Sequence, residues 1–255
     1  MMRVIKVGGR TQSDPALASL LARSWNNGSR ARFVLVHGGG DELSTLQSAM
    51  GGTAQFVNGR RVTTERDIDL VRMALSGSAN KRLVSTLTAC GVDAVGLSGE
   101  DAALIAATPM DAATLGHVGV PDRVNVALLR HLLAGGYLPV ISPVSRDGSG
   151  TLGAALNVNG DDAAAAIALA LGADELLLVA DVAGVMSDGQ IVSSLTPAAA
   201  DAMLADGSAA GGMRAKLEAA LAAVAGGVPR VRISDVAAIA DPHRGTVVHR
   251  IGESS

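Results

Sequence analysis

The sequence predicts an α/β protein, a three-layer sandwich in which helices cover both faces of an open, mostly parallel sheet. Three observations predict this fold class. Short runs rich in β-branched residues alternate with longer amphipathic runs rich in Ala and Leu. The short runs are mostly apolar rather than alternating between apolar and polar residues, as strands are in a sheet covered on both faces. Apolar residues make up 48% of the 255 residues, which is enough for a sizeable core.

The order of these runs predicts the elements one by one. Strands are expected at residues 3–7, 32–37, 93–97, 138–142, 175–180, 230–233 and 246–250. Helices are expected at residues 15–26, 42–50, 65–89, 124–134, 161–171, 197–205 and 212–225. The stretch 145–153 is rich in Gly, Ser and Asp, which favours a turn or hairpin tip. We expect two lobes that meet near Gly172, formed by residues 1–171 and 172–255.

Composition and charge exclude several classes of protein. The formal net charge is −3, so neither a nucleic-acid partner nor an anionic membrane surface is expected. No apolar run approaches the ~20 residues of a membrane span, and the N-terminus lacks the features of a signal peptide. A single cysteine, Cys90, excludes an internal disulfide framework and a multi-cysteine zinc site. Its apolar helical context predicts a buried thiol. These features together predict a soluble, cytoplasmic protein.

Two glycine clusters follow successive predicted strands. Lys6 and Val7 precede Gly8 and Gly9, and His37 precedes a run of three glycines at residues 38–40. Ligands gather at the carboxyl ends of parallel strands, where glycines expose backbone N–H groups that suit an anion. Neither cluster matches the P-loop pattern or the G-x-G-x-x-G dinucleotide pattern, which argues against an oxidoreductase. We expect His37 to be a positioned hydrogen-bonding group rather than an acid or base.

Lysine is rare in this chain, since only Lys6, Lys81 and Lys216 occur among 21 basic residues. Lysine supplies a compact point charge that fits beside a phosphoryl oxygen, whereas arginine supplies a planar fork. Lys216 follows a Gly-Gly pair at the start of a predicted helix. A positive charge there stabilises the helix poorly and favours a bound phosphate.

Further polar residues precede predicted helices. Arg61 follows a glycine turn, and an arginine there can clamp a carboxylate through two parallel hydrogen bonds. Since Arg60 is its neighbour in an extended segment, we expect one of the two to face solvent. Asn157 lies just before the helix at 161–171, where Asp161 or Asp162 could serve as its N-terminal cap.

Ten short motifs in order resemble the N-acetylglutamate kinases of the amino-acid kinase superfamily. They are Lys-x-Gly-Gly, His-Gly-Gly-Gly, Asn-Gly-x-Arg-Val-Thr, Gly-x-Ala-Asn-Lys, Gly-His-Val-Gly, Gly-Tyr-Leu-Pro-Val, Asn-x-Asn-x-Asp, Gly-Ala-Asp, Asp-Val-x-Gly-Val and Gly-Met-x-x-Lys. The motifs lie between Lys6 and Lys216, and the resemblance as a whole runs from residue 3 to about residue 251. Each motif alone is weak, but ten in the right order and spacing are specific.

The resemblance implies a role for each matching residue. Lys6 and Lys216 would bracket the transferred phosphoryl group, and Asp161 would organise both lysines. The glycines would hold the phosphoryl group and the acylated amino acid; they are Gly8, Gly9, Gly38, Gly39 and Gly40. Arg61 and Asn157 would bind acetylglutamate.

The ATP nucleoside would lie near Asp181, Gly184, Gly212 and Met213. Mg²⁺ would accompany ATP by bridging its β- and γ-phosphates, and we expect no metal site made of protein ligands alone.

The resemblance also implies the reaction and the assembly. The N-terminal lobe would bind the acylated amino acid and form a dimer, and the C-terminal lobe would bind ATP. The motif run begins at residue 4, leaving no room for the N-terminal helix of the arginine-inhibited relatives. A homodimer insensitive to arginine is therefore expected. The implied reaction is ATP-dependent phosphorylation of the γ-carboxylate of N-acetyl-L-glutamate, in arginine biosynthesis.

Three other interpretations stay open. Arg60 stands where relatives often have an apolar residue, which could alter the acyl pocket. An acceptor with an N-succinyl group is one open alternative. A sister kinase of carrier-protein-linked aminoadipate or glutamate shares Asn-Lys-Arg-Leu-Val and Gly-Leu-Ser-Gly, which occur at residues 80–84 and 96–99. That kinase usually has a basic surface, and the net charge of −3 favours the free amino acid instead. An inactive amino-acid sensor on the same fold is disfavoured because both lysines and Asp161 are intact.

Overall fold

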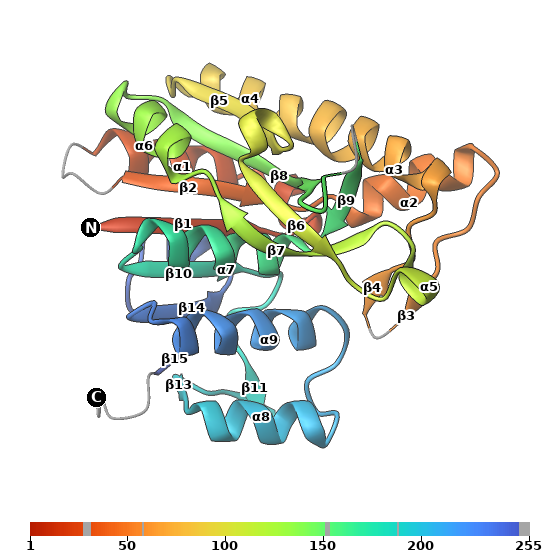
Figure 1. Cartoon of the computed structure of the whole chain (residues 1–255). Helices are drawn as coiled ribbons and strands as arrows, with labels where there is room; N and C mark the ends of the chain where they lie inside the picture. Colours follow the sequence, from red (N-terminus) through yellow and green to blue (C-terminus); the bar gives the residue numbers. More distant parts are fainter. Residues whose placement is uncertain (28–31, 58, 151–153, 188, 250–255) are drawn as a thin grey trace.

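A computed structural model describes residues 1–27, 32–57, 59–150, 154–187 and 189–249 (Figure 1). Its central sheet has six parallel strands: β5 (Ala94–Gly99), β8 (Leu138–Asp147), β2 (Arg32–His37), β1 (Met2–Val7), β10 (Glu175–Val179) and β14 (Arg230–Ser234). β15 (Thr246–Val248) joins antiparallel beside β14, and β13 (Ser194–Leu195) pairs with β15. Helices cover both faces, so the predicted fold class is confirmed.

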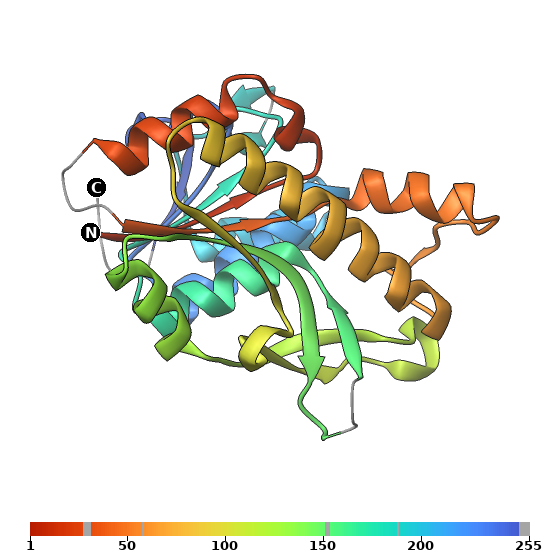
Figure 2. The same ribbon diagram turned by 90° about the horizontal axis from the view of Figure 1, so that it is seen from above.

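Two groups of helices form the outer layers (Figure 2). One face carries α6 (Val126–Ala134), α7 (Gly160–Leu171) and α9 (Gly211–Gly226), with α8 (Pro197–Ala205) packed on α9. The other face carries α1 (Leu17–Asn26), α4 (Asn80–Ala89) and the short helix η4 (Val236–Ile239). α7 contacts β1, β2 and β10, so it crosses the middle of the sheet.

Strand alternation determines which side chains reach α7. In β1, Val4 packs into the core beneath α7, whereas Ile5 and Val7 pack into the core beneath α1 and α4. Successive side chains of a strand point to opposite faces, so Lys6 shares the face of Val4. The strand thereby directs Lys6 toward the N-terminus of α7.

The predicted helix at 65–89 is continuous but not uniform. It consists of α3 (Glu65–Val71), a π-helical stretch η2 (Arg72–Ala79) and α4, and the backbone stays helical at both junctions. Leu75 of the π-helical stretch lies against the glycine turn after β2. A Cβ atom on Gly39 would come within 2.5 Å of Leu75 Cδ2. The glycine therefore allows the turn and this helix to approach closely.

Several strands and short elements were not predicted. They are β6 (Ile105–Pro109), β7 (Val118–Val124), β9 (Ala155–Val158), β13, the hairpins β3 (Phe56–Val57) to β4 (Arg60–Arg61) and β11 (Met186–Ser187) to β12 (Gln190–Ile191), α5 (Ala112–Leu115), and the short helices η1 (Arg10–Ser13), η3 (Asp101–Ala103) and η4. The helix α2 (Gly40–Ala49) begins two residues before the predicted start at residue 42. β6 and β7 each contain a proline, which weakens the sequence signal for a strand.

The β8–β9 pair is antiparallel, as the hairpin prediction for 145–153 requires. Residues 151–153 of that prediction, and Arg250 of the last predicted strand, lie outside the described residues.

The prediction of a buried thiol was wrong, because Cys90 is exposed. α4 ends at Ala89, and Gly91 adopts a left-handed conformation with φ of +77°. Cys90 therefore lies in the turn that closes the helix rather than on its buried face. Among the described residues, no helix is long and apolar enough to cross a bilayer.

Candidate active site

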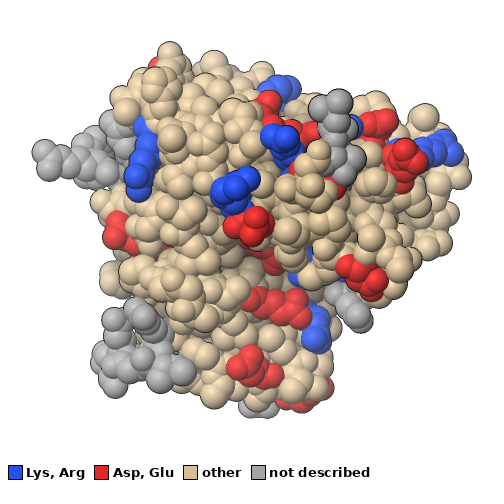
Figure 3. All heavy atoms as spheres, in the orientation of Figure 1, with Lys and Arg blue, Asp and Glu red and all other residues tan. Residues whose placement is uncertain are grey.

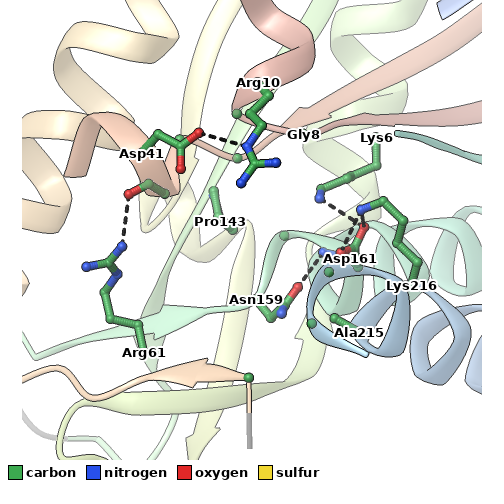
Figure 4. Close-up of a pocket in the computed structure, with 18 of the residues that line it drawn as sticks. Lys6, Gly8, Arg10, Asp41, Arg61, Pro143, Asn159, Asp161, Ala215 and Lys216 are labelled. Carbon is green, nitrogen blue, oxygen red and sulfur yellow. Dashed lines mark hydrogen bonds and ion pairs between the residues drawn. The ribbon is translucent and has the colours of Figure 1, made fainter. Parts of the chain in front are cut away.

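A cleft of about 770 Å³ opens at the carboxyl ends of β1, β2 and β10 (Figure 4). Its walls come from the glycine turns after β1 and β2, the β3–β4 hairpin, and the starts of α2, α7 and α9. Every residue expected in the site lines it except Gly184. Segments from both ends of the chain therefore meet at one place.

Three helix N-termini point into this cleft. Gly40, Gly160 and Gly211 are the first residues of α2, α7 and α9, and all three line the cleft. The first N–H groups of a helix have no partner within the helix, and they carry a partial positive charge. The cleft therefore suits a ligand with several phosphate groups.

Lys6, Asp161 and Lys216 form a buried cluster on the floor of the cleft. Lys6 Nζ lies 2.9 Å from Asp161 Oδ1, and Lys216 Nζ lies 3.3 Å from each carboxylate oxygen of Asp161. The lysines come from β1 and from the second turn of α9, and the aspartate comes from α7. One carboxylate thus holds two ammonium groups that enter from different sides.

The cluster carries a net positive charge. Burial alone would raise the pKa of Asp161, but the ammonium groups of Lys6 and Lys216 outweigh this effect and lower it. Burial and the nearby Lys6 lower the pKa of Lys216 to about 8, although Asp161 opposes that change. Asp161 is therefore ionised at neutral pH, and Lys216 loses its charge in mildly alkaline solution.

This pKa predicts a pH dependence that can be measured. We expect kcat/KM for ATP to fall above pH ~8, approaching tenfold per pH unit, because the free enzyme loses the Lys216 charge. A bound phosphate favours the charged form, so kcat at saturating ATP should stay level to higher pH. Initial rates between pH 6 and 10 check both profiles. A kcat/KM that stays level to pH 9.5 would contradict the assignment.

Asp161 is free for this role because another residue caps α7. The side chain of Asn159 accepts a hydrogen bond of 2.8 Å from Asp161 N, so the proposed Asp cap is wrong. Gly160 lies beside Lys6, and a Cβ atom there would come within 3.1 Å of Lys6 Cε. In the Asn-Gly-Asp sequence, Asn159 therefore caps the helix and Gly160 leaves space for the Lys6 side chain. Asp161 is then left to contact the Lys6 ammonium group.

The two glycine turns are joined to each other. Gly38 N donates to Val7 O at 3.0 Å, which ties the end of β2 to the end of β1. A Cβ atom on Gly9 would lie 3.4 Å from both Gly39 Cα and Gly40 N. Glycine at these positions therefore leaves a space walled by backbone, as a phosphoryl group requires.

His37 is buried and is not among the described residues that line the cleft. Its Nδ1 lies 2.9 Å from Gly38 O, and its Nε2 lies 3.0 Å from Asn80 Nδ2. Since the Asn80 amide donates, Nε2 accepts and Nδ1–H donates to the carbonyl. Burial lowers the pKa of His37 to about 4, so the ring is neutral. His37 therefore positions the Gly38 peptide, as the sequence predicted.

Arg61 stands at the other end of the cleft. Its guanidinium donates to Gln47 Oε1 at 3.0 Å, to Gly40 O at 2.9 Å and to Ser44 Oγ at 2.7 Å. It also lies 4.8 Å from the centre of the Phe56 ring. Three hydrogen bonds fix the guanidinium against α2 with its remaining N–H groups available.

Arg60 is paired as well, so the prediction that one arginine faces solvent was wrong. Arg60 Nη1 lies 2.7 Å from Asp162 Oδ2, and both side chains are largely buried. Asn157 also lines the cleft, and its Nδ2 donates to Thr63 Oγ1 at 2.9 Å. The ion pair between Arg60 and Asp162 ties the β3–β4 hairpin to the start of α7. Asn58 of this motif lies outside the described residues.

The remaining expected residues separate into two groups. Asp181, Gly212 and Met213 line the cleft on the side of β10 and α9. Gly184 packs elsewhere, since a Cβ atom on it would come within 2.6 Å of Ile191 Cγ2 and 2.8 Å of Thr246 Oγ1. The described lining of the cleft does not include it.

Further polar residues that the sequence did not predict as site residues also line the cleft. Arg10, Asp41, Ser44 and Asn159 line the cleft beside the expected residues. A signal was available for three of them: Arg10 and Asp41 directly follow the glycine clusters, and Asn159 shares the side of Asn157 in an extended segment. No pattern in the sequence marks Ser44.

Comparisons with known proteins agree with this geometry. The amino acid kinase family model matches residues 1–235. Acetylglutamate kinase of Chloroflexus aurantiacus is 43% identical over 240 residues, 93% of each chain. Acetylglutamate kinase of a Ruegeria species is 47% identical over 239 residues, covering 91% of this chain and 81% of that protein.

A solved structure from Streptococcus mutans superposes with a TM-score of 0.87 at 28% identity, covering 98% of each chain. N-acetylglutamate synthase of Neisseria gonorrhoeae, solved with coenzyme A and N-acetyl-glutamate, superposes with a TM-score of 0.81 at 26% identity. That match covers 100% of this chain and 60% of the synthase. The matches to sequence and structure span nearly the whole chain, so the protein belongs to the amino acid kinase family.

Proposed function

We propose that this enzyme transfers the γ-phosphoryl group of ATP to the γ-carboxylate of N-acetyl-L-glutamate, as in the second step of arginine biosynthesis. The observation that carries the proposal is the Lys6–Asp161–Lys216 cluster, which places two ammonium groups at one carboxylate on the floor of the cleft. The relatives named acetylglutamate kinase support the choice of acceptor.

Phosphoryl transfer to a carboxylate requires positive charge around the phosphoryl group and alignment of the acceptor with ATP, and it does not require a proton-transfer group. A carboxylate oxygen of the acceptor attacks the γ-phosphorus, the bond from that phosphorus to the β-phosphate oxygen breaks, and ADP leaves with the electron pair. The carboxylate is already ionised, so no general base is needed. This agrees with the neutral, inward-turned ring of His37.

Each residue of the cluster has a separate task in this proposal. Lys6 extends from β1 and stabilises charge on the acceptor side of the phosphoryl group. Lys216 extends from α9 and stabilises charge on the ATP side. Asp161 holds both ammonium groups in place and offsets part of their mutual repulsion. The glycine turns and the α2 N-terminus supply N–H groups to the phosphoryl oxygens.

The two ends of the cleft differ in character. Arg61 and Asn157 border the acceptor end, where Arg61 can bind a carboxylate with its remaining donors. Asp181, Gly212 and Met213 border the nucleotide end. We assign residues 1–171 to the acceptor lobe and residues 172–255 to the nucleotide lobe.

Mg²⁺ belongs to the proposal as a companion of ATP. Among the described residues, no group of three or more His, Cys, Asp and Glu side chains could hold a metal ion. The residues present therefore fit a metal that is held chiefly by the nucleotide phosphates, where it would neutralise charge on the β- and γ-phosphates. The resemblance further supports a cytoplasmic location and a homodimer, and light scattering on the purified protein would test the homodimer.

A comparison of four acceptors tests the function. ADP release would be coupled to an optical signal, and hydroxylamine would trap the acyl phosphate. The acceptors are N-acetyl-L-glutamate, N-succinyl-L-glutamate, N-acetyl-L-aminoadipate and free glutamate. We expect efficient turnover with N-acetyl-L-glutamate, and at least about tenfold weaker kcat/KM for the others, the cost of one misfitted methylene or a lost polar contact.

Turnover with none of these acids would contradict the proposal and favour a carrier-protein-linked acceptor. The face of the molecule in Figure 3 does not favour that alternative. Figure 3 shows basic and acidic side chains interspersed over one face of the molecule, with no broad basic field there to bind an acidic carrier protein.

A further inference from the structure

Arg10 is a charged residue of the cleft with no role in the function proposed so far. It directly follows the Gly8–Gly9 turn and begins the short helix η1. Figure 4 shows its side chain pointing into the cleft, between Asp41 and the Lys6–Asp161–Lys216 cluster. The side chain is 75% exposed, whereas Lys6 and Lys216 are buried.

The partners of Arg10 come from opposite walls of the cleft. Arg10 Nε lies 3.4 Å from Asp41 Oδ2, and Arg10 Nη1 lies 3.4 Å from Asp181 Oδ2. Asp41 belongs to the first turn of α2, and Asp181 follows the end of β10. Arg10 therefore lies between the wall that borders the acceptor and the wall that borders the nucleotide.

Both ion pairs are weak. The carboxylates are 70% and 60% exposed, and long contacts between exposed charges contribute little to stability. The other two arginines of the cleft are held more firmly. Arg60 has a 2.7 Å contact with a largely buried carboxylate, and Arg61 makes three hydrogen bonds. Arg10 can therefore exchange its partners at small cost.

A polyphosphate is a stronger partner than either carboxylate. It carries more charge, and pairs of its oxygens match the planar fork of a guanidinium. The helix N-termini and glycine turns that suit phosphate groups surround Arg10. We propose that Arg10 is a third phosphate-binding cation, which leaves Asp41 and Asp181 when nucleotide enters and donates two hydrogen bonds to the outer phosphates of ATP.

This assignment rests on the proposed use of ATP but not on the identity of the acceptor. Its test is therefore nucleotide binding without acceptor, measured by isothermal titration of the whole protein with ATP, ADP and AMP. For Arg10→Ala we expect ATP affinity to fall about 10- to 100-fold, the loss of a hydrogen bond to a charged group. AMP affinity should stay within about twofold, because the α-phosphate lies beyond the proposed contact.

Two further variants distinguish phosphate binding from a merely structural bridge. Arg10→Lys retains the charge without the fork, so its ATP affinity should lie between those of the wild type and Arg10→Ala. Asp41→Asn removes a competing carboxylate, so ATP should bind about two- to fivefold more tightly. If Arg10 only held the two walls together, Asp41→Asn would bind ATP as weakly as Arg10→Ala does. Arg23→Ala, on the exposed side of α1, is the matched control.

The outcomes separate the two proposals. Wild-type protein that binds no ATP would overturn the proposed function and, with it, the role of Arg10. ATP binding that Arg10→Ala leaves within twofold would overturn the role of Arg10 alone. The role of Arg10 would also be overturned if Arg10→Ala lost as much affinity for AMP as for ATP. The same holds if Asp41→Asn lost as much ATP affinity as Arg10→Ala.

Discussion

Replacing Lys6 or Lys216 by arginine is expected to lower kcat by about 10²- to 10³-fold, the cost of losing one preorganised group that stabilises the transition state. Arginine keeps the charge, so the loss would come from geometry. Both ammonium groups contact the same carboxylate, at 2.9 and 3.3 Å, in a buried site. A guanidinium is broader than an ammonium and spreads its charge over three nitrogens. It cannot take the same place between Asp161 and a phosphoryl oxygen.

The chain offers a matched control for these variants. Lys81, the third lysine, lies on α4 with Nζ 3.0 Å from Gly96 O, outside the cleft. Lys81→Arg should retain nearly full turnover in the coupled assay. Thermal melting of all three variants would confirm that they remain folded. Turnover near the wild-type value in either Lys6→Arg or Lys216→Arg would rule out the mechanism with two lysines.

The parallel core and the position of Lys6 and Lys216 in the cleft could be predicted because local signals mark them. The strands of the core are apolar runs, and glycines follow two of them directly. The parity of β1 also places Lys6 on the same face as Val4, where α7 packs. Since parallel strands end together at one edge, two glycine clusters imply one site.

The local sequence does not separate the roles of Asp161 and Asp162. The family resemblance selects Asp161, and the tertiary structure shows how the surroundings of the two carboxylates differ. Both fall in the first turn of a helix, where an acidic residue is favourable in any case. Their roles differ because Asn159 caps the helix, while β1 and α9 bring lysines to Asp161 and the β3–β4 hairpin brings Arg60 to Asp162. Pairings between distant segments leave no local pattern.

The surroundings of Arg60 and Cys90 also could not be predicted from the local sequence. In an extended segment adjacent side chains diverge, but the β3–β4 hairpin is short and bordered on both sides, so both arginines find partners. Cys90 lies one residue beyond the end of a helix whose last turn the apolar pattern does not define. Helix ends depend on the following turn, here at Gly91, more than on the helix itself.

Asp161→Asn should reveal how the lysine pair keeps its charge. Asparagine retains the shape of the side chain but removes the only charge that contacts both ammonium groups in the described site. The pKa of Lys216, already lowered to about 8 by burial and Lys6, should fall further without Asp161. At neutral pH the variant would then lack one of its two positive charges, and kcat should drop about 10²- to 10³-fold.

Acidification should partly restore the Asp161→Asn variant, because a lower pH returns the proton to the lysine. Between pH 8 and 6 we expect kcat of the variant to rise severalfold while that of the wild type stays level. The variant should also be less stable to urea by about 3–5 kcal/mol at pH 6, where both buried ammonium groups are charged and unpaired. Asp201→Asn, on the exposed surface of α8, should change neither property. A variant whose kcat stays as level as that of the wild type between pH 8 and 6 would contradict this role of Asp161, since charge compensation requires the two profiles to diverge.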